Sequence, residues 1–387
     1  MQGTFARCGA LTTLLFIAAL VGGGTSNAAD VWPAPRPHMQ APVTMAGVAV
    51  NRDAVSQADQ VTPMSTASTD DRRPVVIISD LNDLGDDSIA ILMLLRSGQF
   101  DIRGIITTSG NVCASLGATE ATRLVQSAGA ASIPVVQGFP LSWHDERRRF
   151  YEDVERPSWR RRAYVGAFAD PQSCAPSGAV ETKIEASDFL IEQARVAKAG
   201  LTIILIGPAT VLAEAMRKEP QLAGLIRRVY AMGGAIAAPG NVTEHAEFNV
   251  WFDPEAMAAV LASRVPMTLV PLDATAGVTY EQLPRPDKAT HDFAASHLAD
   301  YLARADTKGS PVRMWDEVLA AVVIDPTLVA TGQEVYLSVS TARDDRYGKL
   351  LSSPVATDGT SRPVEVVTKV QADRVRQLVV ELLLTGG

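Results

Sequence analysis

The sequence predicts an α/β fold, a single large domain with a Rossmann-like, doubly wound and mostly parallel sheet flanked by helices. Short continuous apolar runs rich in β-branched residues recur along the chain, and such runs are typical of strands buried on both faces of a parallel sheet. Amphipathic helical patterns lie between the runs, and this alternation of strand and helix is the pattern of an α/β domain. A fold of this kind binds its ligand outside the carboxyl ends of the strands.

The first strand is expected where Pro74-Val75-Val76-Ile77-Ile78 opens the ordered part of the chain. One helical pattern then separates each apolar run from the next, as a parallel sheet with crossover helices requires. The expected strands, in chain order, are residues 74–78, 102–107, 133–136, 201–206, 229–232 and 267–272. The expected helices between them are residues 86–96, 118–127, 186–198, 210–217 and 254–262.

The N-terminal residues carry the features of a signal peptide. Arg7 supplies the positive charge, and the apolar run from Leu11 to Val21 is shorter than the ~20 residues that span a bilayer. Ser26-Asn27-Ala28 then provides a small-x-small cleavage pattern. We therefore expect residues 1–28 to be a signal peptide and the protein to be exported, periplasmic or secreted. A retained N-terminal anchor is the alternative.

Two further segments are expected to differ from the folded domain, which we place at residues 74–387. Residues 29–73 are rich in Pro, Ala and Ser without apolar periodicity, which predicts a flexible leader. Residues 143–164 interleave arginines with aromatic and acidic side chains. This segment is expected to be an insertion or lid, and a nucleic-acid-binding segment is the alternative.

The charge balance limits the partners that the chain can bind. The sequence has 35 basic and 43 acidic residues, a net charge of −8, which is the wrong sign for a protein that binds nucleic acid or an anionic membrane surface. We therefore expect a cation or a neutral small molecule as partner, no nucleic acid, and no membrane after signal cleavage. Cys113 and Cys174 remain once Cys8 leaves with the signal peptide, and in an exported chain they either form a disulfide or stay free.

An acidic loop follows the first expected strand directly. Asp80, Asp83, Asp86 and Asp87 fall within eight residues, and like charges so close repel one another and raise one another's pKa. A bound hard cation such as calcium, which takes carboxylate, amide and carbonyl oxygens as ligands, removes that cost. The spacing is not that of an EF-hand. Capping of the following helix would explain one or two of the acids, but it leaves the others unexplained.

Further motifs follow the acidic loop in an order that resembles one family. The chain is similar, over residues 74–385, to the inosine-uridine preferring nucleoside hydrolases. The loop Asp80–Asp87 is similar to that family's opening motif. The other matching segments are residues 105–112 with Gly110-Asn111, 133–138, 205–210, 232–234, 240–243, 246–249, 253–256, and Trp315-Asp316 opening a helix.

This resemblance implies the nucleoside hydrolase fold and hydrolysis of the N-glycosidic bond of a ribonucleoside, with calcium at the bottom of the pocket. The implied metal ligands are Asp80, Asp87, the backbone carbonyl of Thr210, and Asp316. The implied substrate-binding residues are Asp86, Asn111, Asn241, Glu247, Phe248, Asn249 and Trp315. Sugar hydroxyls need several convergent donors and acceptors, which acids and amides supply. The family also implies a homo-oligomer, either a dimer or a tetramer.

The general base is the first point at which the sequence departs from the family. The commonest form of the opening motif places the base at Asn82, and an amide cannot accept the proton. A second form, Asp-x-Asn-x-x-x-Asp-Asp, fits Asp80–Asp87 without a gap, so we expect Asp80 to be both metal ligand and base, with Asn82 in support. Asp83 is the alternative base. A ribose-compound or calcium-binding protein with an impaired site is the alternative function.

The leaving-group acid is the second departure. Trp315 stands where many members carry a histidine, and tryptophan offers a stacking face but no useful acid. His245 is expected to take the acid's role, and a solvated loop residue is the alternative. The family's glycine-rich His-Gly segment is missing as well, which leaves the base preference open.

Overall fold

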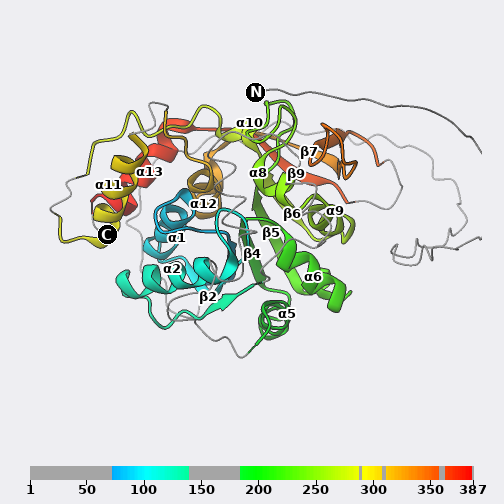
Figure 1. Ribbon diagram of the computed structural model, residues 1–387, viewed down its shortest axis with the longest axis horizontal. Coiled ribbons are helices and arrows are strands. Elements are labelled where there is room, and N and C mark those ends of the chain that lie inside the picture. The colour runs from blue at the N-terminus through cyan, green and yellow to red at the C-terminus, as the bar shows by residue number, and fades with distance from the viewer. Residues whose placement is uncertain (1–71, 139–183, 287–289, 307–310, 357–361, 386–387) are drawn as a thin grey trace, which may run out of the picture. The chain divides into compact units, whose positions relative to one another are not determined.

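The structure is a computed structural model that describes residues 72–138, 184–286, 290–306, 311–356 and 362–385 (Figure 1). The signal peptide, nearly all of the leader, Cys174 and the segment 143–164 lie outside the described residues. The described residues fall within one compact unit that begins at Met64.

A nine-stranded sheet forms the centre of the fold, in the order β3-β2-β1-β4-β5-β6-β9-β7-β8. The strands from β3 to β9 in this order pair in parallel, and β7 pairs antiparallel with both β9 and β8. The strands are β1 Arg73–Ser79, β2 Phe100–Thr107, β3 Val135–Gln137, β4 Leu201–Ile206, β5 Ile226–Met232, β6 Met267–Val270, β7 Val329–Val339, β8 Leu350–Ser353 and β9 Val364–Val370.

Helices cover both faces of the sheet and form a separate hydrophobic core on each (Figure 1). One face packs against α1 Asp86–Arg96, α2 Ala114–Ser127, α11 Phe293–Asp306, α12 Asp316–Ile324 and α13 Ala372–Leu383. The other face packs against α5 Ala186–Val196, α6 Thr210–Lys218 and α9 Pro254–Ala262. Shorter elements are α7 Leu222–Leu225, α8 Phe248–Phe252, α10 Leu272–Thr275 and the 3₁₀-helix Pro326–Leu328.

The structure confirms the predicted α/β fold class. Every expected strand and helix is present, and α1, α9 and β4 have the expected bounds. The strands β7, β8 and β9, between which the antiparallel pairings of the sheet lie, were not anticipated. The reason is visible in β7, where Thr331 to Glu334 lie exposed within a strand of eleven residues, so the strand has no continuous apolar run.

The register of the sheet brings distant loops to one level. Ser79 at the end of β1 pairs with Thr107 of β2 and with Ile206 of β4. The segments that follow these three residues therefore start side by side, at the carboxyl edge where an α/β sheet binds its ligand. Within the described residues, none of the helices has the length and apolar character that crossing a membrane requires.

Candidate active site

The acidic loop leaves β1 and enters α1. Gly85 is the residue before the helix, so Asp86 and Asp87 form its first turn, where the helix dipole favours negative charge. The Ser79 hydroxyl donates a hydrogen bond of 2.6 Å to Oδ1 of Asp87, and Asp87 is 1% exposed. This hydrogen bond fixes the buried Asp87 carboxylate next to Ser79, the last residue of β1.

Asp316 joins the acidic loop from the far end of the chain. It is the first residue of α12, which packs against α1. One carboxylate oxygen from each of Asp86, Asp87 and Asp316 lies within 4.8 Å of the others, and Asp87 and Asp316 are buried. Burial, together with repulsion from the neighbouring aspartates, raises the pKa of both well above the ordinary value. A divalent cation with oxygen ligands fits this cluster, because it offsets both effects.

Asp80 lies beside this cluster and is 1% exposed. Its Oδ2 accepts a hydrogen bond of 2.6 Å from the backbone N–H of Asn111. The pKa of Asp80 is raised to about 8, chiefly by burial and also by the charges of Asp86 and Glu247, against the opposing effect of that hydrogen bond. A carboxyl group with this pKa can exchange a proton near neutral pH.

Two glycines allow Asp80 to sit between the loops that follow β2 and β4. A Cβ atom at Gly110 would lie 2.0 Å from Oδ2 of Asp80, and one at Gly207 would lie 3.0 Å from Oδ1. The side chain is therefore enclosed by backbone on both sides. Gly110 and Gly207 fall within the motifs quoted from the sequence, but their role in packing Asp80 needed the structure.

Asn111 links the two buried acids of the loop. Its backbone N–H binds Asp80, and its Nδ2 lies 3.4 Å from Oδ2 of Asp87, to which it donates. Cys113, two residues later, is the residue before α2 and is disulfide-bonded. The structure thus places Asn111 against Asp80 and Asp87, and its contact with ribose stays a prediction.

The motif around Glu247 forms the start of α8. The Glu247 carboxylate is 2% exposed and accepts hydrogen bonds from the backbone N–H groups of Gly234 at 2.7 Å, Asn249 at 2.9 Å and Val250 at 3.2 Å. Burial raises the pKa of Glu247, and these three N–H groups act against that shift. Glu247 therefore has a capping role in this structure, in addition to the substrate contact that the sequence predicts.

The other expected ribose-binding residues of this region also have structural partners. Asn241 Oδ1 accepts the backbone N–H of Phe248 at 3.0 Å. Asn249 Nδ2 donates to the backbone carbonyl of Met232 at 3.2 Å, and the Phe248 ring packs near Trp251 and Phe252. These contacts hold the segment at the end of β5, and binding of ribose by its side chains stays a prediction.

Thr210, His245 and Trp315 were predicted as metal ligand, leaving-group acid and stacking residue. Thr210 is the first residue of α6, and its hydroxyl donates to Oδ2 of Asp253 at 2.6 Å. His245 is half-buried in the turn before α8, where its backbone N–H donates to Oγ1 of Thr243 at 3.2 Å. Trp315 is half-buried and directly precedes Asp316. All three roles stay predictions.

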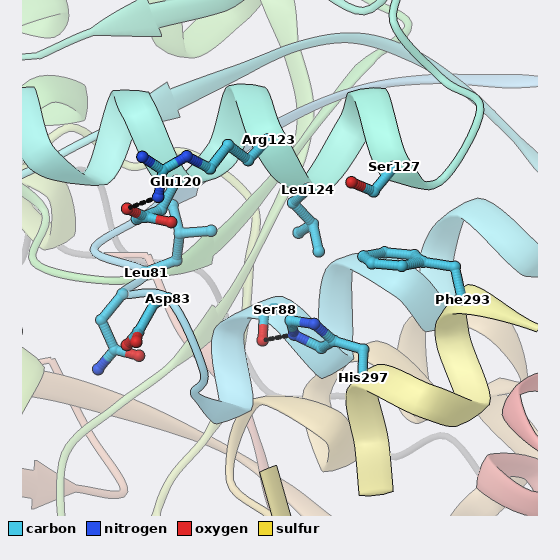
Figure 2. Close-up of a pocket in the computed structure, with 10 residues that line it drawn as sticks. Leu81, Asp83, Ser88, Glu120, Arg123, Leu124, Ser127, Phe293 and His297 are labelled. Atoms are coloured by element: carbon cyan, nitrogen blue, oxygen red, sulfur yellow. Dashed lines mark hydrogen bonds and ion pairs between the residues drawn. The ribbon is translucent and has the colours of Figure 1, made fainter. Parts of the chain in front are cut away.

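Asn82 and Asp83 occupy another side of the acidic loop. Asp83 is exposed and forms an ion pair of 2.8 Å with Arg304 of α11, so the structure gives no support to Asp83 as the alternative base. Asn82 lines a cavity of about 160 Å³ between the loop, α2 and α11 (Figure 2). Its Oδ1 is buried and has no hydrogen-bond partner among the described residues.

Sequence reasoning missed Glu317, which follows Asp316. It is fully buried, and its Oε1 accepts a hydrogen bond of 2.7 Å from the Tyr280 hydroxyl. Burial, with the charge of Asp86 next, raises the pKa of Glu317 well above the ordinary value. The available signal was the acidic pair Asp316-Glu317 at the head of an otherwise apolar helix.

The chain is similar to known nucleoside hydrolases in sequence. Residues 77–377 match the family described as inosine-uridine preferring nucleoside hydrolase. The chain is 31% identical over 202 residues to an uncharacterized protein of Schizosaccharomyces pombe, covering 51% of this chain and 61% of that protein. It is 28% identical over 235 residues to the probable uridine nucleosidase 2 of Arabidopsis thaliana, covering 60% and 69%. It is 26% identical over 306 residues to the pyrimidine-specific ribonucleoside hydrolase RihB of Escherichia coli O157:H7, covering 77% and 93%. The match therefore spans less than two thirds of the fission-yeast protein and nearly all of the bacterial one.

Solved structures show the same fold. A plant nucleoside hydrolase superposes with a TM-score of 0.67 at 23% identity, covering 81% of this chain and 99% of that chain. A purine-preferring ribonucleoside hydrolase from Gardnerella vaginalis superposes with a TM-score of 0.66 at 22% identity, covering 80% and 98%. Because the identities are only 22–23%, these likenesses are evidence for the fold alone.

The buried carboxyls predict a pH-dependent stability for the cation-free chain. The pKa of Asp80 is raised from 3.8 to about 8, so the folded chain retains a proton that the unfolded chain releases. This contribution to stability is complete below the unfolded pKa and is lost as pH rises through the folded pKa. Thermal unfolding in chelator should therefore give a melting temperature that falls between about pH 4 and about pH 8. Added calcium should raise it most at the alkaline end, and an Asp80→Asn variant should show a weaker slope. A melting temperature that rises with pH in chelator would contradict this assignment.

The close approach of Gly110 to Asp80 predicts that Gly110→Ala is destabilising. The new Cβ would overlap Oδ2 of Asp80, and overpacking of this kind costs about 1–3 kcal/mol. Gly224→Ala is the matched control, because no atom lies within 4 Å of its Cβ position. It lies in helix α7, so Ala should stabilise the fold there by about 0.4–1 kcal/mol. Equal free energies of unfolding for the two variants in denaturant titrations would show that the enclosure of Asp80 is unimportant.

Proposed function

This chain belongs to the inosine-uridine preferring nucleoside hydrolase family, and from this premise we propose that it hydrolyses the N-glycosidic bond of a ribonucleoside or related N-riboside to ribose and free base. Members of that family are N-glycosidic hydrolases of the EC 3.2.2 type. The observation that carries the proposal is the group of buried carboxylates at the carboxyl edge of the sheet, formed by Asp80, Asp87 and Asp316 with the half-buried Asp86.

The chemistry of the reaction explains why carboxylates gather there. Cleavage of the N-glycosidic bond places positive charge on the ribose in an oxocarbenium-like transition state. Surrounding carboxylates stabilise that charge more than they stabilise the neutral substrate, so they lower the barrier. Asp86, Asn111, Asn241, Glu247 and Asn249 are the groups proposed to bind the ribose hydroxyls.

Calcium is the cation we propose for the cluster, held by Asp80, Asp87, Asp316 and the backbone carbonyl of Thr210. A bound calcium ion would acidify a water molecule and offset the repulsion among the carboxylates. The support for this choice is the approach of carboxylate oxygens of Asp86, Asp87 and Asp316 to within 4.8 Å of one another. Asp80, Asp87 and Asp316 are also buried.

Asp80 is the proposed general base. Its carboxylate is buried next to the cluster, and the backbone N–H of Asn111 fixes one oxygen, which leaves the other to accept a proton from water. Asn82, two residues later, is proposed to support the loop. The departing base requires protonation or stabilisation as an anion, and His245 is the proposed acid, with Trp315 and Phe248 as stacking faces.

The names of two relatives support a choice of the first substrate to test. The Arabidopsis and Escherichia coli relatives are named for uridine and for pyrimidine ribonucleosides, so we propose a pyrimidine ribonucleoside as the first substrate to test. We also propose that residues 1–28 are removed on export to the periplasm or medium, and that the mature chain forms a dimer or tetramer. N-terminal sequencing and light scattering of the exported protein test these two points.

One assay separates the proposed hydrolase from a binding protein. The mature chain is incubated with a panel of purine and pyrimidine nucleosides, reducing sugar is followed, and the assay is repeated after calcium is stripped. We expect ribose release that is lost in chelator and restored by calcium. Tight calcium retention with no sugar released from any nucleoside would favour a ribose-compound or calcium-binding protein.

Replacement of the proposed base tests its role. Asp80→Asn removes the proton acceptor and should lower kcat by at least ~100-fold, the usual contribution of a general base. Asp83→Asn, in the same loop but in an exposed ion pair with Arg304, is the control and should retain near-normal kcat. Circular dichroism checks that both variants fold. Near-normal turnover of Asp80→Asn would assign the base elsewhere.

A further inference from the structure

Three polar contacts join α11 and the residue before it to α1 and the loop that precedes α1. Arg96 at the end of α1 pairs with Asp292 at 2.6 Å, just before α11 begins. The Ser88 hydroxyl contacts Nε2 of His297 at 2.8 Å, and Arg304 pairs with Asp83 at 2.8 Å. The middle contact is the one that reaches the first turn of α1, which also carries Asp86 and Asp87.

The direction of the middle hydrogen bond follows from its neighbours. Ser88 Oγ lies 2.6 Å from the carbonyl oxygen of Gly85, which can only accept, so the single hydroxyl proton is donated there. Ser88 Oγ must then accept from His297, and we assign the imidazole proton to Nε2 on that basis. In Figure 2 the imidazole of α11 faces the Ser88 hydroxyl. His297 thus holds the same hydroxyl that closes the turn from Gly85 to Ser88.

A cavity lies behind the loop that leads into this turn, so the hydrogen bond between His297 and Ser88 is important for the turn's position. The cavity of about 160 Å³ described above separates the loop residues Leu81, Asn82 and Asp83 from α2 and from Phe293 of α11 (Figure 2). Side chains therefore do not fill the space behind the loop, and dispersion contacts there are correspondingly fewer. The Arg304–Asp83 pair is about half exposed on both sides, and exposed pairs contribute little. Ser88, by contrast, is 1% exposed.

We propose that His297 is a positioning residue of the cation site, whose Nε2–H···Oγ bond to Ser88 fixes the first turn of α1 and so holds Asp86 and Asp87 against Asp316. The inference rests on the proposed function in so far as the carboxylate cluster binds calcium. Partners that orient metal ligands typically change metal affinity by ~10–100-fold when removed. Loss of this bond should therefore weaken calcium binding by ~10-fold, at the lower end, because the bond acts through the turn.

Calcium alone is the probe, titrated calorimetrically into the calcium-stripped mature chain. His297→Leu removes the donor but keeps an apolar side chain of similar bulk, and should raise the Kd for calcium by ~10-fold. His297→Gln retains an N–H donor at a similar reach and should restore most of the affinity. Arg304→Gln, on the same helix but in the exposed ion pair, is the matched control and should bind calcium as the unmodified chain does.

A double-mutant cycle tests the route through Ser88. If His297 acts through the Ser88 hydroxyl, Ser88→Ala should weaken calcium binding to a similar degree, and the double variant should bind no more weakly than either single one. Ser88→Ala also keeps the imidazole, so it remains informative if His297→Leu fails to fold. Additive losses would contradict the proposal, as would unchanged affinity in His297→Leu or equal affinity losses in His297→Leu and His297→Gln.

The titration contains no nucleoside, so its outcome is separate from that of the hydrolysis assay. Weakened calcium binding in His297→Leu, with no nucleoside hydrolysed by the unmodified chain, would support the positioning role and reject the proposed function. Calcium-dependent hydrolysis with unchanged calcium affinity in His297→Leu would reject the positioning role alone. If the unmodified chain bound no calcium, both the positioning role of His297 and the cation site would be rejected.

Discussion

Several carboxylates are buried together at one edge of the sheet, and this determines the chemistry of the site. Asp80, Asp87 and Asp316 are each at most 3% exposed, and Glu317 and Glu247 lie near them, also buried. Groups of this kind repel one another and lose hydration, so they hold protons unless a cation is present. No Lys or Arg contacts the carboxylates of Asp80, Asp87 or Asp316 within hydrogen-bond or ion-pair distance in the described part of the chain. Whether these carboxylates are protonated or ionised therefore depends on whether a cation binds between them.

The fold supplies these carboxylates from positions far apart in the sequence. The register of β1 with β2 and β4 places the loops after Ser79, Thr107 and Ile206 at one level, and α12 packs on α1 so that Asp316 meets Asp87. Backbone N–H groups and glycines then fix individual side chains, as Asn111 and Gly110 do for Asp80. The two hydrophobic cores hold this arrangement from both faces of the sheet.

The sequence predicts the local parts of this arrangement well and the long-range parts poorly. The bounds of β4 follow from a continuous apolar run and those of α1 and α9 from amphipathic helical patterns. The acidic loop is conspicuous because Asp80 and Asp87 lie close together in the chain. Asp316 was placed with the loop only through a family resemblance. Glu317 and His297 were missed because their partners, Tyr280 and Ser88, lie 37 and 209 residues away in sequence. The exposed strand β7 lacks the apolar run by which the buried strands were found.

If the carboxylates of Asp87 and Asp316, with Asp80 beside them, surround one divalent cation, crystals of the mature chain grown in calcium should show it by anomalous diffraction. We expect one anomalous peak at about 2.3–2.6 Å from oxygens of Asp87 and Asp316, the distance range of calcium ligands. A well-ordered crystal in calcium with no anomalous peak between these two side chains would contradict it.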